Sequence, residues 1–246
     1  MASSRHPLQS ALDIACAQPV AARVNLLAIE TSTEFLSLAV SRGDTVFAHH
    51  AQAGQRHAEL ILDSISALLE RAGLRLGDLE GIAYGEGPGS FTGLRIACGV
   101  VQGLALARGL KVLGVSTLLA LAEEAAVDKV VACIDARMGE VYVAAYSRMG
   151  GAWGIVQPRA LMRPQDCAAP PGPACSCVGS GFASHGTVLC ERLGAGLERV
   201  DAALAPSAAA VLRVARPGFA RGEGRAAETA VPVYVRDKVA LKTSER

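Results

Sequence analysis

The stretch GIAYGEGPGSFTGLRIACGVVQGLALARG, from Gly81 to Gly109, decides how this chain is expected to fold. A short apolar run, Ile82–Tyr84, leads into a loop that holds four glycines and one proline. Ser90 and Thr92 then offer hydroxyl groups where a helix needs an N-cap. The stretch therefore predicts a strand, a tight loop and a helix.

The predicted helix, Leu94–Ala107, has an unusual composition, because its only polar side chains are Arg95 and Gln102. A helix that is apolar nearly all round is expected to be buried on all sides. Small residues recur along it at helical spacing and form a stripe: Ile96, Gly99, Val100, Gly103 and Ala107. Each glycine costs about 1 kcal/mol relative to alanine inside a helix, so we expect a neighbour pressed against this backbone. Whether that neighbour belongs to this chain is left open by the sequence.

Length and composition place the chain among globular proteins. Its 246 residues can bury a sizeable core in one large domain or two lobes, and 51% are hydrophobic. The formal net charge is +1, and lysine and arginine are scattered, so this chain alone is a poor candidate for nucleic-acid binding. No stretch approaches the ~20 apolar residues of a membrane span.

The seven cysteines suggest reduced thiols in the cytoplasm, which is the expected location. Cys167, Cys175 and Cys177 invite a metal-site interpretation, but their spacing matches no common zinc pattern. We therefore interpret them as free thiols in a proline-rich loop.

The first 23 residues look detached from the rest of the chain. They are expected to form a loosely ordered extension, or to reflect a wrongly chosen start codon with Val24 as the true initiator.

Val24–Ile29 is a continuous apolar run, as expected of a central strand covered on both faces. Phe35–Ser41 and Thr45–His50 follow after tight turns, which predicts an antiparallel meander.

An amphipathic helix is predicted over Gln55–Arg71, ended by Gly73. Its predicted core stripe comprises Ala58, Ile61, Leu62, Ile65, Leu68 and Leu69. A second, weaker apolar face comprises Leu60, Ser64 and Ala67. The order up to Gly109 is thus β-β-β-α-β-α.

The pattern then restarts, which suggests two lobes built on one plan. VVACIDARMGEVYVAAYSR shares the rhythm of NLLAIETSTEFLSLAVSR: an apolar strand, an acidic residue, a polar turn and a second strand. The predicted elements are a strand at Lys111–Val115, a helix at Thr117–Ala126, a strand at Val130–Ile134, a turn at Asp135–Arg137 and a strand at Val141–Ser147. Residues 150–181 are expected to be loops around short strands, followed by a helix at Ala208–Ala215 and a strand-like stretch at Val231–Val235.

Two segments could take part in phosphate chemistry. The loop GEGPGSFTG before a helix is compatible with an anion site and equally with a structural turn. Thr31, Ser32 and Thr33 stand where two-lobed sugar kinases and actin-like ATPases carry an Asp-x-Gly-Thr phosphate loop. Ser32 replaces the glycine that lets the backbone approach phosphate, so these are weak nucleotide-binding candidates.

Nucleophilic and acid–base chemistry finds little support. His57 has no partner histidine or cysteine nearby in the sequence, which favours a capping or interfacial role. No Ser-His-Asp arrangement and no pair of carboxylates can be assembled from the sequence with any specificity.

At this point the chain resembles the TsaB (YeaZ) family. The resemblance is carried by LLAIETSTEFLSLAV, QRHAELILDSISALL, GIAYGEGPGSFTGLRIACGVVQGLALARG, VLGVSTLLALAE and VPVYVRDKVA, and covers nearly all of residues 24–240. It implies an α/β protein with the two-lobed, duplicated actin-like/Hsp70-like (ribonuclease H-like) fold. The expected lobes are residues 24–109 and a degenerate second lobe at 110–246, whose C-terminal helix is free to pack back on the first.

The resemblance also implies a function. TsaB-like chains are non-catalytic partners of TsaD, which transfers threonylcarbamoyl to the adenosine beside the tRNA anticodon. The expected partners are TsaD, the small ATPase TsaE, a second copy when the chain is alone, and tRNA only through the complex. No cofactor is expected for this chain itself, and the resemblance is compatible with ATP or ADP binding at the joint with TsaD.

Comparison with TsaD-like chains argues against a metal site. After the glycine-rich helix those chains carry Gly-Val-Asn-His-x-x-x-His, whose two histidines bind a metal. Here Thr117 and Leu121 stand in those places, and leucine cannot ligate a metal. We therefore expect no metal and no catalysis, and a metallopeptidase activity fails for the same reason.

The leading hypothesis is a scaffold that docks through the two helices of the first lobe. The expected interface residues are His57, Leu60, Ile61, Ser64, Arg95, Ile96, Gly99, Val100 and Gly103. The alternative is an ATP-binding kinase or ATPase of the same fold, and a third hypothesis is a self-sufficient threonylcarbamoyltransferase, which would require metal.

Overall fold

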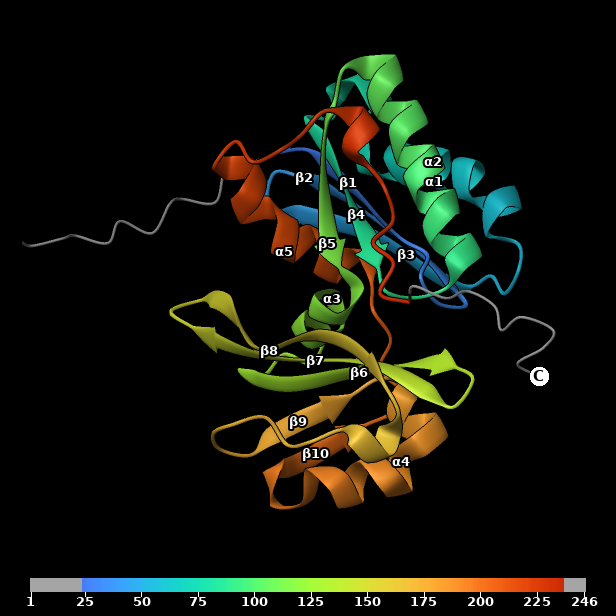
Figure 1. The fold of residues 1–246 in the computed structure, drawn as a ribbon. Helices are drawn as coiled ribbons and strands as arrows, with labels where there is room; N and C mark the ends of the chain where they lie inside the picture. The colour runs from blue at the N-terminus through green and yellow to red at the C-terminus, as the bar shows by residue number, and fades with distance from the viewer. Residues whose placement is uncertain (1–23, 237–246) are drawn as a thin grey trace, which may run out of the picture.

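A computed structural model describes residues 24–236, which build two sheets stacked one above the other in Figure 1. The predicted extension at residues 1–23 lies outside the described residues. Each sheet has five strands, in the orders β3-β2-β1-β4-β5 and β10-β9-β6-β7-β8. The strands of the first sheet are β1 (Leu26–Glu30), β2 (Phe35–Arg42), β3 (Thr45–Gln52), β4 (Gly81–Gly87) and β5 (Lys111–Ser116). Those of the second are β6 (Lys129–Arg137), β7 (Glu140–Met149), β8 (Ala152–Met162), β9 (Cys175–Val178) and β10 (Leu197–Asp201).

The two sheets follow one topology, which confirms the duplication predicted from the sequence. In each sheet the first strand pairs antiparallel with the second and parallel with the fourth. The helices are α1 (His57–Ala72), α2 (Phe91–Arg108), α3 (Thr117–Glu124), α4 (Ser180–Leu193) and α5 (Ala208–Ala220). The second copy is degenerate, because a short 3-10 helix, Pro164–Asp166, stands where the first copy has α1.

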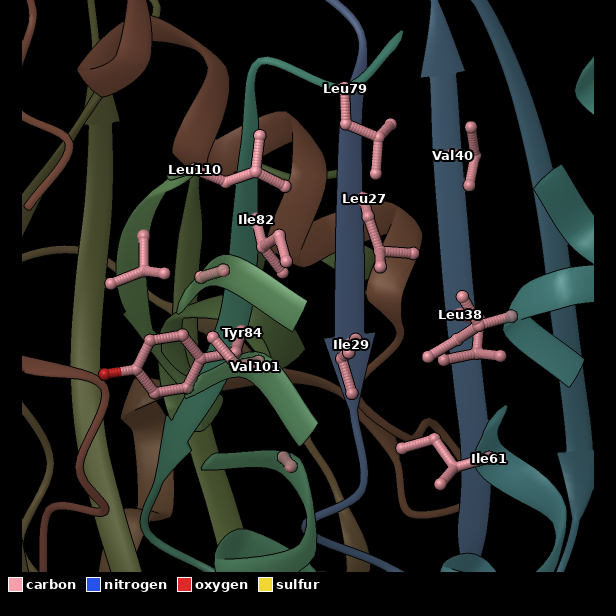
Figure 2. Packing of buried hydrophobic residues seen from close by; sticks show 14 of the residues in the cluster. Leu27, Ile29, Leu38, Val40, Ile61, Leu79, Ile82, Tyr84, Val101 and Leu110 are labelled. Carbon is pink, nitrogen blue, oxygen red and sulfur yellow. The ribbon is translucent and has the colours of Figure 1, made fainter. Parts of the chain in front are cut away.

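The first sheet is covered on both faces, as its nearly continuous apolar strands require. Helices α1 and α2 cover one face and α5 the other (Figure 1). Figure 2 shows the first face, where Leu27, Ile29 and Ile82 meet Ile61 of α1 and Val101 of α2. The opposite face of the same strands carries alanines, among them Ala28, Ala39 and Ala83, against α5. Alternation along each strand thus places bulky side chains under α1 and α2.

The first sheet continues past residue 109, where the sequence placed the boundary between the lobes. Strand β5 pairs in parallel with β4, so the first copy ends after Ser116. Helix α3 follows directly and packs against β6 and β7 of the second sheet as well as against α5. The C-terminal helix α5 lies on the first sheet, so the chain crosses between the lobes twice.

Several expectations for the second lobe were wrong. Strand β6 runs through Arg137, and the turn falls at Met138 and Gly139, both with positive φ, rather than at Asp135–Arg137. Residues 152–162 form a strand of eleven residues where loops around short strands were expected. Its side chains are mostly half-buried, as on an edge strand, so it lacks a strong apolar alternation. Helix α4 and strand β10 were not anticipated.

The C-terminal stretch Val231–Val235 contains no strand, in contrast to the prediction. One backbone bond, from Val233 N to Glu86 O at 2.7 Å, joins it to β4. Before it, Arg225 forms a two-bond bridge with Val112, and Ala230 O accepts from Gln102 of α2 at 2.9 Å. The segment is therefore held by hydrogen bonds from three separate elements of the first lobe rather than by a ladder.

The start of α2 is fixed by close contact with the turn that follows β1. A Cβ on Gly93 would collide with the Thr31 carbonyl oxygen, and one on Gly89 would lie 2.6 Å from Ser32 Cβ. Ser90 caps the helix by accepting from Gly93 N at 3.3 Å, as its position predicts. The loop GEGPGSFTG thus packs closely on the turn that follows β1.

This packing separates two kinds of glycine on the same helix. We expect Gly93→Ala to lower the free energy of unfolding by about 1–3 kcal/mol, because the added methyl overpacks the turn. Gly99→Ala should raise it by about 0.5–1 kcal/mol, because nothing lies within 4 Å of its Cβ position. Urea unfolding of both variants measures this. Equal effects at the two positions would show that the distinction is wrong.

Candidate protein-docking surface

Helix α2 exposes the stripe of small residues that the sequence singled out. We call Ile96, Gly99, Val100, Gly103 and Ala107 the α2 stripe. Gly99, Gly103 and Ala107 are exposed, and Ile96 and Val100 are half-buried. No heavy atom lies within 4 Å of a Cβ placed on Gly99 or Gly103. The neighbour that these glycines indicate is therefore absent from residues 24–236.

The expectation that α2 is buried on all sides was wrong for the chain by itself. Its buried side comprises Gly93, Leu94, Ala97, Cys98, Val101 and Ala105, which pack toward the sheet. On the outer side Leu106 is 65% exposed. The composition reflects a helix with one face on its own sheet and another apolar face left open.

Gly99 and Gly103 differ from glycines at which the chain itself leaves no room for a side chain. Gly85 leaves room for the Glu30 carboxylate, and Gly181 for the Cys133 side chain and backbone. Such positions exclude a side chain because the chain itself fills the space. At Gly99 and Gly103 the space is empty, although a helix interior disfavours glycine. A local structural requirement thus explains the first pair and not the second.

Helix α1 contributes less to this surface than the sequence suggested. Ile61 is 1% exposed and belongs to the core, and His57 is buried with Nε2 donating to the Phe35 carbonyl oxygen at 3.1 Å. These two predicted interface residues are therefore not exposed at the surface of the chain. The helix phase also differs from the prediction, because Ala58 and Leu62 are exposed, Leu62 by 56%. Positions one and two turns from Ile61 face the sheet, and Leu62 is turned to the side.

Leu60 and Ser64 are half-buried on another side of α1. Arg71, which shares that side at helical spacing, donates to Ala48 O of β3 at 3.5 Å. This side of α1 therefore lies over the sheet edge formed by β3. The open apolar surface is accordingly carried mainly by α2.

The predicted phosphate loop is filled by the chain's own backbone. Thr31 and Ser32 are buried, and Thr33 is half-buried. Thr31 Oγ1 donates to Gly93 O at 2.8 Å, and Ser90 N donates to Ser32 O at 2.7 Å. Ser32 N is used as well, donating to a Glu30 carboxylate oxygen at 2.6 Å. These contacts use the Thr31 hydroxyl and the N–H and C=O groups of Ser32 within the chain.

Glu30 is the buried acid at the junction of the lobes. Its side chain is 1% exposed, and its second carboxylate oxygen accepts from Thr117 Oγ1 of α3 at 3.4 Å. Burial raises the pKa of Glu30 above its ordinary value of 4.5, and the hydrogen bonds from Ser32 and Thr117 oppose that rise. Nearby, Glu86 of β4 pairs with Arg159 of β8 at 2.9 Å and ties the two sheets together.

The two positions where TsaD-like chains carry metal-binding histidines hold buried side chains in this structure. Thr117 and Leu121 are both fully buried in α3, and Leu121 packs against the second sheet. The three cysteines considered for metal are free thiols that lie in the core beside Cys133. Cys175 and Cys177 belong to β9 rather than to a loop. In the part of the chain that the structure describes, no group of three or more His, Cys, Asp or Glu is arranged to hold a metal.

Sequence reasoning missed two aromatic residues beside α2. Phe91 begins the helix and Tyr234 belongs to the C-terminal segment, and both contact Arg95. Phe91 and Arg95 are one turn apart, so the sequence held a signal for that contact. Tyr234 lies 139 residues from Arg95 and could be placed only by the fold.

No helix among residues 24–236 is long and apolar enough to cross a membrane.

Known proteins match the chain over most of its length. A family model described as "TsaD: tRNA N6-adenosine threonylcarbamoyltransferase" matches residues 48–240. The "tRNA threonylcarbamoyladenosine biosynthesis protein TsaB" of Escherichia coli (strain K12) is 39% identical over 228 residues, covering 89% of this chain and 97% of that protein. The protein of the same name from Bacillus subtilis (strain 168) is 33% identical over 131 residues, covering 52% of this chain and 57% of that protein.

Two solved structures from Pseudomonas aeruginosa share both fold and sequence. The structure named "YeaZ" is 39% identical with a TM-score of 0.79, covering 86% of this chain and 99% of that one. An uncharacterized protein "with similarity to peptidase YEAZ" is 39% identical with a TM-score of 0.80, covering 87% of this chain and 100% of that one. The duplicated fold described above is thus shared by solved relatives.

The burial of Glu30 predicts how stability depends on pH. The folded state favours the protonated carboxyl, so the stability contributed by protonated Glu30 is lost as pH rises above 4.5 through the raised pKa. Glu30→Gln cannot ionise and keeps an acceptor for Ser32 N. The unfolding free energy of the variant minus that of the wild type should therefore increase from pH 4 to pH 8, by about 1.4 kcal/mol per unit of pKa displacement.

Thermal and urea unfolding across this pH range measure the difference. Glu70→Gln serves as the control, because Glu70 is exposed on α1. A difference between Glu30→Gln and wild type that stays constant with pH would contradict the argument.

Proposed function

Because the chain belongs to the TsaB (YeaZ) family, we propose that it is a non-catalytic docking subunit in tRNA threonylcarbamoyladenosine biosynthesis. In this proposal it binds the catalytic TsaD through the α2 stripe. The E. coli relative that carries this biosynthetic name aligns over nearly its whole length, which supports the assignment of pathway. The docking role is supported by the surface of α2.

The single observation that carries the proposal is the open space at Gly99 and Gly103. Glycine at two exposed positions of a helix interior costs about 2 kcal/mol together relative to alanine. Close approach of another backbone explains that cost, and no described part of this chain approaches. A partner helix laid along the α2 stripe would meet the glycines and bury Ile96 and Val100.

The exposed apolar side chains of α2 mark where the centre of an interface with TsaD would lie. Apolar surface removed from water contributes about 25 cal/mol per Å², before the costs of association are subtracted. A stable interface buries about 800 Å² on each partner. The α2 stripe with Leu106 supplies the apolar centre that such an interface needs.

The absence of catalysis by this subunit is supported by the residues of α3. Where TsaD-like chains carry two metal-binding histidines, this chain has the buried Thr117 and Leu121. Neither a leucine side chain nor a hydroxyl already bonded to Glu30 offers the imidazole ligands of those chains. In this proposal the chemistry belongs to the partner, TsaE joins the complex, and tRNA reaches this subunit only through it.

Nucleotide is proposed to bind at the joint with TsaD and not to this chain alone. The filled turn at Thr31–Ser32 supports this and disfavours the kinase or ATPase alternative. Calorimetry of the isolated chain with Mg²⁺-ATP should show no micromolar binding, and a phosphate-release assay no turnover. Micromolar affinity accompanied by turnover would establish the alternative.

The docking role is tested by filling the open space. Gly103→Leu and Gly99→Leu should each weaken binding to the TsaD of the same organism by at least about 100-fold, because the new side chain holds the helices apart. Binding is measured by calorimetry, and thermal unfolding reports on the fold. Gly186→Leu is the matched control, because Gly186 lies in α4 of the other lobe with nothing within 4 Å of its Cβ position.

Folded Gly99→Leu and Gly103→Leu variants that bind TsaD like the wild type would refute docking through α2. Reconstituted threonylcarbamoylation of tRNA should fall in parallel with binding.

A further inference from the structure

An arginine at the edge of the α2 stripe is held in place by two aromatic rings. The guanidinium carbon of Arg95 lies 3.7 Å from the centroid of the Phe91 ring. Its Nε donates to the hydroxyl of Tyr234 at 2.9 Å, and the Phe91 and Tyr234 ring centroids are 5.3 Å apart. A stacking contact and a hydrogen bond from a different segment thus fix the plane of this guanidinium.

No residue in the described part of the chain, 24–236, forms a hydrogen bond with the two terminal nitrogens of this arginine. The Arg95 side chain is exposed, and within residues 24–236 only its Nε has a hydrogen-bond partner. An exposed arginine is usually mobile, and ordering it costs side-chain entropy when it binds. Here the Arg95 side chain is already ordered in the folded chain, so binding does not have to order it. Its two terminal nitrogens therefore form a preorganised pair of donors, which we call the fork.

The cluster adjoins the proposed docking surface. Arg95 and Gly99 are separated by one helical turn, and the aromatic rings remain accessible, with Phe91 38% and Tyr234 44% exposed. Arginine and tyrosine are among the residues that contribute most to binding at protein interfaces. A partner helix seated on the α2 stripe would therefore pass within reach of the fork.

We propose that Arg95, oriented by Phe91 and Tyr234, is a carboxylate receptor that binds one Asp or Glu side chain of the TsaD partner. This inference rests on the proposed function, because it uses the same docking surface. A planar fork binds a carboxylate through two parallel N–H···O bonds, which adds affinity and fixes the register of the two helices. The α2 stripe alone carries no directional polar group, so it specifies register less strongly than such a pair would.

A nucleic-acid phosphate fits this site less well. The only other cation on α2 is Arg108, thirteen residues and thus ~20 Å further along the helix. Arg236 of the neighbouring segment is already paired with Glu140 at 2.8 Å. Binding to a nucleic-acid backbone draws on several cations together, whereas one isolated fork suits one carboxylate.

The test compares Arg95→Gln, Arg95→Lys and Tyr234→Phe with the wild type by calorimetry against TsaD at 50 and 300 mM salt. Arg95→Gln should weaken binding by about 10- to 100-fold, the factor for hydrogen bonds to a charged group. Arg95→Lys should recover little of that loss, because an ammonium cannot form the fork. Tyr234→Phe should weaken binding a few-fold, since the ring stays and only the orienting bond is lost.

The salt dependence of the affinity for TsaD distinguishes an ion pair formed by Arg95 from a role of Arg95 in packing alone. The wild-type affinity should fall more steeply with salt than that of Arg95→Gln. Thermal unfolding of all three variants should match the wild type, because the cluster is exposed.

Each other outcome overturns the inference. Arg95→Gln could bind TsaD with wild-type affinity and salt dependence while Gly103→Leu does not bind; the receptor would then be refuted and the docking surface retained. If Arg95→Gln lowered only the retention of tRNA by the complex, the ligand would be a phosphate. If it changed only self-association in sedimentation, the occupant would be a second copy. Wild-type binding by Gly103→Leu would instead refute the proposed function.

Discussion

The structure depends on the contact between the turn after β1 and the start of α2. The carbonyl oxygens of Thr31 and Ser32 lie so close to Gly93 and Gly89 that no side chain fits between them. Ser90 N donates to Ser32 O, and Thr31 Oγ1 donates to Gly93 O, so both segments use their polar groups on each other. This contact fixes where α2 begins and in which direction it leaves the sheet.

Two consequences follow from that contact. The turn after β1 is packed against the helix start, and the Thr31 hydroxyl and the N–H and C=O of Ser32 form hydrogen bonds within the chain. At the same time α2 packs against β4 with its inner side buried and its outer side open. A helix that is already folded and carries an apolar outer face suits binding to another protein, because little order must be gained when the complex forms.

The first half of the fold could be predicted from the sequence because its signals are local. The apolar run at β1, the glycine-rich loop and the αL glycine after α1 each determine their own structure. The internal repeat predicted the second sheet, which has the same strand order as the first. Strand β8 was missed because an edge strand with half-buried side chains has little alternation. The C-terminal segment was misjudged because single bonds to β4 and α2 hold it, and those depend on residues more than a hundred positions away.

The candidate surface was predictable in part for the same reason. Spacing alone placed Gly99 and Gly103 on one side of α2, but only the fold shows that no neighbour fills their space. The sequence could not distinguish Ile61 from Leu62, adjacent residues of which one is buried and the other exposed. That distinction depends on how α1 is rotated over β2 and β3. Tyr234, which orients Arg95, is brought to α2 by the path of the chain after α5.

The central claim is that the outer side of α2 is covered by a partner. Hydrogen–deuterium exchange of this chain with and without TsaD tests it most directly, because no substitution is needed. The account predicts that protection gained on binding is concentrated in peptides from residues 91–108, with a smaller gain at residues 231–236. Protection confined to the second lobe, with α2 exchanging as in the free chain, would contradict it.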